Sequence, residues 1–328
     1  MAYGFGNMIK QLRQNPKSIV FTEGTDPRIL EAASRLLAGN FLFPILIGNE
    51  QEVFAAAEEA GYNIRGASII DPNNWDRFDE MVDLLVEIRK SKGMTREKAI
   101  PICRQGNYFG TMLVKMGVAD CLLGGATYST ADTVRPALQI IKTKPGNSCV
   151  SSCFILVRPS ASGENEVLAM GDCAINIKPT EDELAEIGVE IAECAKIFGI
   201  DPKIAYLSYS TRGSGKGEDV DKMRNAARKA KALNPSLNID GEMQFDAAVS
   251  PRVGALKCPE SEVAGHANTF VFPDINAGNI GYKIAQRLGN FEAYGPILLG
   301  LNAPINDLSR GCNAIEVYSM AIITAALA

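Results

Sequence analysis

The sequence predicts an α/β protein with two domains and largely parallel sheets. Along the first 141 residues, short apolar strands alternate with helical segments, an order that is typical of parallel α/β sheets. The strands lack alternating polar residues, which indicates that both faces of the sheet are covered. With 328 residues, 46% of them hydrophobic and 22% charged, the chain is long enough for two hydrophobic cores.

The N-terminal half is expected to contain four strands separated by helices. The first strand, 18–21, runs into a turn at 23–27, where Pro27 begins a helix that Gly39 and Asn40 end. The other expected strands cover 43–47, 67–70 and 119–123, and the expected helices cover 28–37, 51–60, 77–92, a stretch capped by Thr95, 107–116 and 130–141.

The polar stretch 142–148, which contains Pro145 and Gly146, is the expected domain boundary. Beyond it, strands at 153–158 and 167–173 flank a polar, hairpin-like stretch at 160–166. Further strands are expected at 204–208, 269–272 and 296–299, and further helices at 181–198, 219–233, 279–288 and 314–327.

Charge and composition exclude several classes of function. The formal net charge of −5 argues against binding to nucleic acid or to anionic membranes. The apolar runs 41–47 and 321–328 are too short to span a bilayer, and residues 1–15 are too polar for a secretory signal. Eight cysteines without a C-x-x-C spacing, beside a single histidine, predict reduced thiols and no metal site. These features predict a cytoplasmic protein.

The segment 303–316 gives the strongest indication of chemistry. It brings the Ser309 hydroxyl, the Arg310 guanidinium and the Glu316 carboxylate to the start of the helix 314–327. This helix is too apolar for a surface and is expected to be buried. Ordered charged groups beside the N-terminus of a buried helix are what an anion-handling active site needs.

Spacing alone leaves two roles open for both charged residues. Arg310 can bind a carboxylate or phosphate through two hydrogen bonds, or it can form a structural ion pair with Asp307. Asn313 and Glu316 have the spacing of a capping box, which offers Glu316 a role in helix capping rather than in catalysis.

Three Gly-containing loops between a strand and a helix have the composition of phosphate cradles. They are 210–217, 273–281 and 124–130. The first can equally be a flexible connection, and the second can serve helix capping by Asn276 or Asn279. Neither a Walker A motif nor a G-x-G-x-x-G fingerprint occurs in these loops.

His266, the only histidine, is expected to be a loop or surface residue rather than a catalytic base. A serine hydrolase would need it, yet the sequence has no G-x-S-x-G elbow. Acid–base chemistry near neutral pH then falls to carboxylates, or is minor because the nucleophile is an acidic group such as a thiol.

Several motifs together resemble the phosphate acetyl/butyryl transferase family over essentially the whole chain. The segments that carry the resemblance are 23–28, 87–90 with 93–95, 129–137, 240–248, 272–283 and 306–311. The resemblance implies reversible transfer of an acetyl group between acetyl phosphate and the thiol of coenzyme A, which is a substrate here. No tightly bound cofactor is implied.

The resemblance also implies an architecture. It predicts two α/β domains with the active-site cleft between them, as in isocitrate and isopropylmalate dehydrogenases, usually in a homodimer. Domain I is then discontinuous and consists of residues 1–146 plus 296–328, while domain II covers 147–295. The expected partners are small molecules, namely coenzyme A, acetyl phosphate and phosphate.

Substrate contacts are implied residue by residue. Ser309 and Arg310 match the acyl phosphate site, where Arg310 neutralises the phosphoryl group and Ser309 hydrogen-bonds at the reacting centre. An acidic protein that binds coenzyme A needs a local cluster of arginines for its phosphates. The matching arginines are Arg89, Arg135 and Arg287, and Ser129 and Thr130 match positions beside the acyl or phosphate group.

Glu316 stands where the family has an aspartate that is proposed as the base for the thiol. The extra methylene moves the carboxylate by roughly 1 Å, which matters for a near-attack geometry. The implied mechanism is direct attack of the thiolate on acetyl phosphate in a ternary complex, with an acyl-enzyme on Cys312 as the alternative.

Three rival functions are open at this point. A butyryl or other acyl phosphate specificity is the nearest, because one methylene of substrate changes selectivity by only about 1–3 kcal/mol. A metal- and nicotinamide-dependent decarboxylating dehydrogenase would need convergent aspartates, which the sequence does not indicate. A non-catalytic binding protein would have lost Arg310 or the carboxylate at 316, and both are present.

Overall fold

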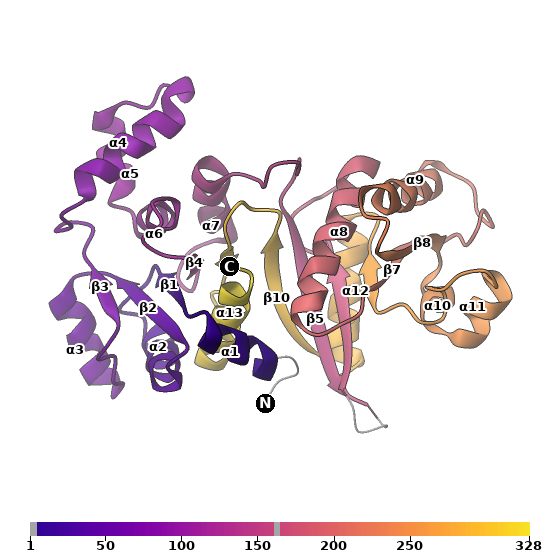
Figure 1. Cartoon of the computed structure of the whole chain (residues 1–328), viewed down its shortest axis with the longest axis horizontal. Helices are drawn as coiled ribbons and strands as arrows, with labels where there is room; N and C mark the ends of the chain where they lie inside the picture. Colours follow the sequence, from indigo (N-terminus) through magenta and orange to yellow (C-terminus); the bar gives the residue numbers. More distant parts are fainter. Residues whose placement is uncertain (1–4, 161–164) are drawn as a thin grey trace. The chain divides into compact units, whose positions relative to one another are not determined.

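The computed structural model describes residues 5–160 and 165–328, which form a mixed α/β structure with two sheets (Figure 1). The described chain divides into two compact units. The N-terminal unit consists of residues 6–144 and 301–328, and the central unit contains Phe5 with residues 145–160 and 165–300. Each unit contains one of the sheets.

The sheet of the N-terminal unit has five parallel strands in the order β11-β4-β1-β2-β3. The strands are β1 Lys17–Phe21, β2 Leu42–Ile47, β3 Ser68–Ile70, β4 Cys121–Gly124 and β11 Ile305–Asp307. The helices are α1 Phe5–Gln14, α2 Pro27–Gly39, α3 Glu50–Ala60, α4 Phe78–Arg89, the 3-10 turn η1 Lys90–Lys92, α5 Arg96–Cys103, α6 Gly106–Lys115, α7 Thr130–Pro136, the π-helical turn η2 Ala137–Ile141 and α13 Ala314–Ala326.

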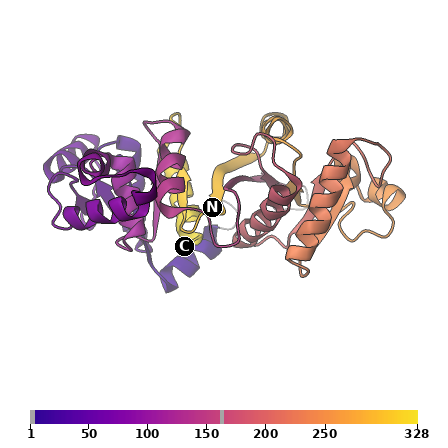
Figure 2. The same ribbon diagram turned by 90° about the horizontal axis from the view of Figure 1, so that it is seen from above.

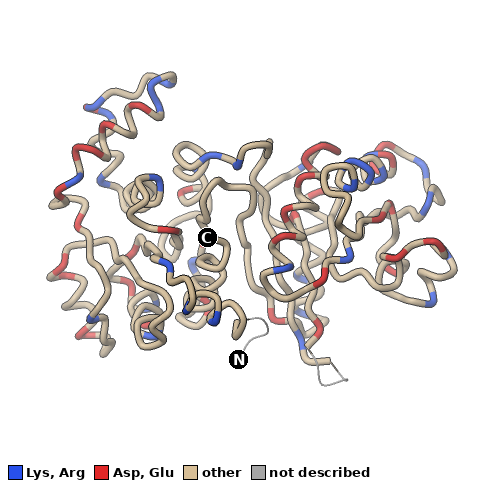
Figure 3. The backbone as a smooth tube through the Cα atoms, viewed as in Figure 1, with Lys and Arg blue, Asp and Glu red and all other residues tan. Residues whose placement is uncertain are grey.

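Helix ends in this unit follow local chemistry. Asp26 caps α2 by accepting a hydrogen bond from the backbone amide of Arg28, and Pro27 occupies the first turn. Asn40 ends α2 in the left-handed conformation with φ 51°. Helix α13 has Glu316 as its only charged residue and is largely buried, as its sequence predicts. Elsewhere, acidic and basic residues are interspersed in both units (Figure 3).

The central unit has a six-stranded sheet in the order β10-β5-β6-β9-β7-β8. The β10–β5 and β5–β6 pairs are antiparallel and the others are parallel. The strands are β5 Ser151–Pro159, β6 Asn165–Gly171, β7 Lys203–Leu207, β8 Asn238–Met243, β9 Thr269–Val271 and β10 Glu292–Leu299. The helices are α8 Glu181–Ile197, α9 Glu218–Leu233, α10 Phe245–Val249, α11 Pro251–Lys257 and α12 Ile275–Leu288.

Alternate side chains of β7 face different layers of the central unit. Tyr206 is fully buried and donates its hydroxyl to the carbonyl of Leu184 in α8, whereas Ala205 and Leu207 belong to the apolar cluster that includes residues of α10 and α12. The sheet is therefore covered on both faces by helices, as Figures 1 and 2 show.

Several predicted boundaries shift in the structure. The predicted second domain boundary at residue 296 falls inside β10, because Ile297–Leu299 continue the pairing with β5. The expected helix 279–288 begins earlier, at Ile275, because Asp274 caps it. Part of the predicted hairpin stretch, 161–164, lies outside the described residues. The division into functional domains stays a prediction.

Some elements were not predicted at all. They are α1, β8, α10, α11 and β11. Strand β8 contains Asp240 and Glu242 among its six residues, and such polar composition does not indicate a strand. Within the described ranges, no helix combines the length and apolar character that a bilayer crossing requires.

Candidate active site

Three loops of the N-terminal unit meet at one edge of its sheet. Strands β11, β4 and β1 are parallel neighbours, so the loops that follow them leave the sheet at the same edge. The strand order also reverses here, because the chain continues from β1 to β2 on one side and places β4 on the other. Such a switch point is the usual ligand-binding position in open α/β sheets.

Glu23, which follows β1, holds the loop after β4. Its carboxylate accepts hydrogen bonds from the backbone amides of Gly125 at 3.0 Å and Thr127 at 3.2 Å, and from the Thr22 hydroxyl at 2.6 Å. Burial raises the pKa of Glu23, although these hydrogen bonds act in the opposite direction. Two amides of the proposed cradle 124–130 are therefore bound to a protein carboxylate.

Asp307, the last residue of β11, holds the start of α7. It is 3% exposed and accepts hydrogen bonds of 2.5 Å from the hydroxyls of Thr130 and Thr133. Burial raises the pKa of Asp307, and the two threonines oppose this shift. Gly125 lies so close that a Cβ atom there would be 2.3 Å from the Asp307 carboxylate, and its φ is +100°. A residue with a side chain does not fit at this position.

Arg28, in the first turn of α2, joins all three loops. Asp26 accepts hydrogen bonds from two nitrogens of its guanidinium. The remaining contacts go to the main-chain carbonyls of Ala126 after β4 and of Arg310 and Cys312 after β11, and Nη1 also contacts the Cys312 sulfur at 3.7 Å. The hydrogen bonds to Asp26 are the largest cause of a raised pKa at Arg28.

The Ser309 and Arg310 side chains are both exposed on the loop after β11. The Ser309 hydroxyl accepts a hydrogen bond of 3.3 Å from the amide of Gly311. Within the described part of the chain, the Arg310 guanidinium makes no hydrogen bond or ion pair. The alternative ion pair with Asp307 is therefore wrong, since that carboxylate is bound to two threonines. Arg310 is left able to bind an anion.

Glu316 forms the capping box that its spacing predicts. Its carboxylate accepts a hydrogen bond of 3.0 Å from the Asn313 amide, and the Asn313 side chain accepts one from the amide of Glu316. Glu316 is exposed. Capping is thus confirmed, and it does not exclude a role as a base.

Cys312 lies between Arg310 and Glu316 in the sequence and is 6% exposed. Burial raises the pKa of its thiol; the nearby Arg28 guanidinium opposes the shift and Glu316 adds to it. A buried thiol with a raised pKa is a poor nucleophile.

A second group of predicted residues lies around α7. Asp132 accepts hydrogen bonds from the Ser129 hydroxyl at 2.7 Å and from the Arg135 guanidinium at 3.0 Å. Burial raises the pKa of Tyr108, and the charges of Arg135 and Arg89 oppose this shift. The Nε atom of Arg89 is buried without a hydrogen-bond partner among the described residues.

Arg287 is not brought together with the other predicted residues within one unit. It is exposed in the last turn of α12, in the central unit. It lies 12 residues after Ile275, which places it about 18 Å along the helix from the loop after β9. The N-terminus of this helix is capped by Asp274 and not by Asn276 or Asn279. Asn279 instead donates to the carbonyl of Cys173.

The loop 210–217 in the central unit also surrounds a protein carboxylate. Glu242 at the end of β8 is 1% exposed and accepts hydrogen bonds from the Gly213 amide at 2.7 Å and the Ser210 hydroxyl at 3.0 Å. Arg224 pairs with the same carboxylate at 2.8 Å. The anion that the loop 210–217 binds in the structure is therefore the Glu242 carboxylate of β8.

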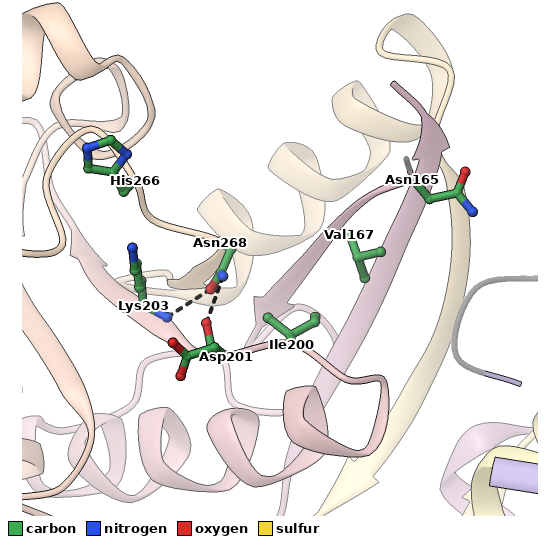
Figure 4. Close-up of a pocket in the computed structure, with 7 residues that line it drawn as sticks. All are labelled: Asn165, Val167, Ile200, Asp201, Lys203, His266 and Asn268. Carbon is green, nitrogen blue, oxygen red and sulfur yellow. Dashed lines mark hydrogen bonds between the residues drawn. The ribbon is translucent and has the colours of Figure 1, made fainter. Parts of the chain in front are cut away.

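His266 lines a pocket of about 330 Å³ in the central unit (Figure 4). The pocket is at the starts of β7 and β9, the edge opposite their carboxyl ends. There the side chain of Asn268 accepts a hydrogen bond from the Lys203 amide at 2.8 Å and donates one to the Asp201 carbonyl at 2.9 Å. His266 is exposed, in agreement with its predicted surface position.

Sequence reasoning missed the roles of Glu23, Arg28 and Asp307. The first two belong to the motif 23–28, which contributed to the family resemblance without an assigned role. The contacts of these residues with other loops lie 98 to 284 positions away in the chain, so no local spacing could have revealed them.

Known proteins are similar to the whole chain. The sequence model of the family described as "Phosphate acetyl/butaryl transferase" matches residues 5–325. Phosphate acetyltransferase of Bacillus subtilis (strain 168) is 52% identical over 328 residues, 100% of both sequences. A phosphotransacetylase structure from Streptococcus pyogenes has a TM-score of 0.94 and 55% identity, covering 98% of this chain and 97% of that one. EutD phosphotransacetylase from Staphylococcus aureus has a TM-score of 0.90 and 47% identity, covering 98% of both chains.

The fold and the loops at the switch point define an α/β enzyme with an exposed cationic side chain, Arg310, at the usual ligand-binding position of such sheets. The chain belongs to the phosphate acetyl/butyryl transferase family. The predicted family, fold class and assignment as an acyltransferase are thereby confirmed. The alternative of a decarboxylating dehydrogenase is not supported.

Proposed function

We propose that the protein interconverts acetyl phosphate and coenzyme A with acetyl-CoA and phosphate, at the loops after β1, β4 and β11. The observation that carries this assignment of the site is the contrast between two arginines. Arg28 is fully occupied by protein groups, whereas Arg310 extends from the same loop system without a protein partner in the described residues. Arg310 is therefore the group available to a phosphoryl group.

The reaction is a displacement at the carbonyl carbon of acetyl phosphate. The sulfur of coenzyme A loses its proton to the Glu316 carboxylate and attacks this carbon, forming the C–S bond. The bond between this carbon and the oxygen that bridges to phosphorus then breaks, and phosphate leaves with the bonding electrons. Arg310 stabilises the departing phosphate, and the Ser309 hydroxyl donates a hydrogen bond at the reacting centre. The reverse reaction uses the same groups.

Coenzyme A carries several phosphate charges, and the arginines near α7 suit them. Arg89 has a buried Nε atom without a hydrogen-bond partner in the described ranges, and Arg135 is half exposed beside Asp132. We assign both to this substrate, together with Arg287 of the central unit. We also place Ser129 and Thr130 beside the acyl or phosphate group. Thr130 is held there by its hydrogen bond to Asp307.

The direct mechanism is favoured over an acyl-enzyme on Cys312. The thiol of Cys312 is buried, and its pKa is raised, so little thiolate forms near neutral pH. Incubation with acetyl phosphate and labelled phosphate, without coenzyme A, is expected to give no labelled acetyl phosphate. Rapid exchange of the label would refute the direct mechanism.

The activity itself is tested by following the thioester absorbance with coenzyme A and acetyl phosphate. We expect thioester formation by the wild type and a loss of about 10²–10³-fold in kcat for Arg310→Ala, the usual effect of removing a group that stabilises transition-state charge. Arg35→Ala is the matched control, because Arg35 is an exposed arginine whose ion-pair partner in the described part of the chain is Glu31. Absence of thioester would reject the function, and an active Arg310→Ala would reject the site.

Acyl-chain preference follows from a second comparison in the same assay. We propose acetyl phosphate as the preferred substrate, because the relatives above are phosphate acetyltransferases and phosphotransacetylases. Butyryl phosphate is expected to give a lower kcat/KM. Equal or higher kcat/KM with butyryl phosphate would assign the chain to the other branch of the family.

We propose a homodimer that forms through the exposed apolar face of α12 and α10. Ile280, Ile284 and Leu288 are 57%, 53% and 80% exposed and form a stripe at intervals of four residues. Phe245 and Val249 of α10 line a groove of about 510 Å³ beside this stripe. An exposed apolar surface of this kind is typical of a protein–protein interface.

Sedimentation velocity tests this dimer. Ile284→Lys is expected to convert dimer into monomer, while Leu233→Lys, an equally exposed position at the end of α9, leaves the dimer intact. A monomeric wild type or a dimeric Ile284→Lys would contradict the proposal. A cytoplasmic location and the absence of a tightly bound cofactor stay predictions.

A further inference from the structure

Arg28 has no hydrogen-bond donor left for a substrate. A guanidinium has five N–H groups, and the structure assigns each of them a partner. Asp26 accepts from Nε at 2.9 Å and from Nη2 at 2.7 Å. The Ala126 carbonyl accepts from Nη2 at 2.9 Å, and the Arg310 and Cys312 carbonyls accept from Nη1 at 2.9 and 3.2 Å.

These five hydrogen bonds connect three segments that are distant in sequence. Asp26 and Arg28 belong to the start of α2, Ala126 to the loop after β4, and the two other carbonyls to the loop after β11. On the loop after β11, Arg28 contacts the main-chain carbonyls of Arg310 and of Cys312. The main chain that carries the Arg310 side chain is thus bound directly to α2.

We propose that Arg28 is a positioning residue for acyl transfer, which fixes the main chain of Arg310 and thereby the direction of its side chain. This inference rests on the proposed function of Arg310. Because Arg28 has no free donor, it acts through the loop and does not touch the phosphoryl group. The Asp26 carboxylate orients the Arg28 guanidinium through two hydrogen bonds and so has a part in positioning Arg310.

Lysine cannot replace arginine in this arrangement. An ammonium group has three donors at one point, whereas the three carbonyls and two carboxylate oxygens are arranged around a planar fork. Arg28→Lys therefore keeps the charge but loses part of the connection. A misplacement of about 1 Å in a reacting group can cost about 100-fold in rate, and we expect a decrease in kcat of this order.

The test compares steady-state kinetics of Arg28→Lys with Arg35→Lys, the same change at an exposed position of the same helix. Arg28→Lys is expected to lower kcat and to raise KM for acetyl phosphate, with KM for coenzyme A unchanged, because the arginines assigned to coenzyme A lie on other elements. A second variant, Asp26→Asn, keeps a good helix cap but weakens the orientation of Arg28, so it is expected to have an intermediate kcat. Rates are divided by the folded fraction from thermal unfolding.

A double-mutant cycle with Arg310→Ala separates positioning from general stability. If Arg28 acts through Arg310, Arg28→Lys costs roughly threefold or less once Arg310 is absent. Independent losses that multiply, an equal rise in both KM values, or rates restored by correction for the folded fraction would each overturn the proposal. An inactive wild type or an unaffected Arg310→Ala would instead show that the proposed function has failed.

Discussion

Replacing Glu316 by glutamine separates the two roles of its carboxylate. As a helix cap, Glu316 accepts the Asn313 amide at 3.0 Å and places a negative charge in the first turn of α13. As a base, it would take the proton of the coenzyme A thiol. Glutamine can still accept the capping hydrogen bond through its side-chain oxygen, but it cannot take up a proton. Alanine removes both functions.

The two roles predict different magnitudes. Loss of one hydrogen bond costs about 0.5–1.5 kcal/mol, and loss of the charge at the helix N-terminus costs about 0.3–1 kcal/mol. Glu316→Ala should therefore lower the free energy of unfolding by about 1–2 kcal/mol, and Glu316→Gln by less than about 1 kcal/mol. A general base contributes about 10²–10⁴-fold in rate, so both variants should lose about 100-fold or more in kcat near neutral pH.

The loss should depend on pH in a direction that identifies the base. A free thiol has a pKa of about 8.5, so the thiolate of the substrate forms without help as the pH approaches this value. The ratio of wild-type to Glu316→Gln kcat is expected to fall between pH 7 and pH 9. Glu316→Asp, which restores the residue of the family pattern, should remain active at all these pH values.

Thioester absorbance gives the rates, and urea unfolding followed by circular dichroism gives the stabilities. A Glu316→Gln variant with wild-type kcat at pH 7 would refute the role of Glu316 as base and leave only the cap. A Glu316→Ala variant as stable as the wild type would refute the energetic role of the capping box. Each role can therefore fail without the other.

Two further predictions concern the scaffold of the site. Burial raises the pKa of Glu23 above 4.5. Its protonated form therefore stabilises the fold most below pH 4.5, and this contribution is lost as the pH rises through the folded pKa. In urea unfolding, the stability of the wild type relative to Glu23→Gln should fall over that range, and a difference independent of pH would contradict this. Gly125→Ala should destabilise the fold by about 1–3 kcal/mol, because φ is +100° and the new Cβ would meet Asp307 at 2.3 Å. Gly61→Ala is the matched control with φ +78° and no atom within 4 Å, and its cost should be only about 0.5–1 kcal/mol; equal costs in the two variants would disprove the close approach.

Much of the fold could be predicted because its signals are local. Strands β1, β2 and β4 are apolar runs followed by turns that contain Gly, Pro or Asn. Helix α13 has a single charged residue among its thirteen. Strand β8 could not be predicted, because Glu242 makes its sequence polar. The partner that satisfies this carboxylate, Arg224, lies 18 residues earlier on α9, and nothing within the strand indicates it.

The candidate site divides in the same way. Ser309, Arg310 and Glu316 could be selected from one short segment, and the capping box of Glu316 follows from spacing alone. Arg28 reads as an ordinary first-turn residue after Asp26 and Pro27. Its importance comes from carbonyls 98 to 284 positions away, a relation that is set by strand order and cannot be read from one sequence.

The Gly-containing loops bear on the proposal that arginine side chains bind the substrates. Loop amides after a strand favour an anion, and the sequence offers such loops after β4 and β7. In the structure both are occupied by carboxylates at or just after the ends of neighbouring strands, the partly buried Glu23 and the buried Glu242. These acids satisfy the amides and make the loops rigid, but they also add negative charge where an anionic substrate would bind. In a protein with a net charge of −5, we therefore look for the phosphate site at a cationic side chain without an acidic partner. Among the described loops at the switch point Arg310 has that property, which is why we propose it for this role.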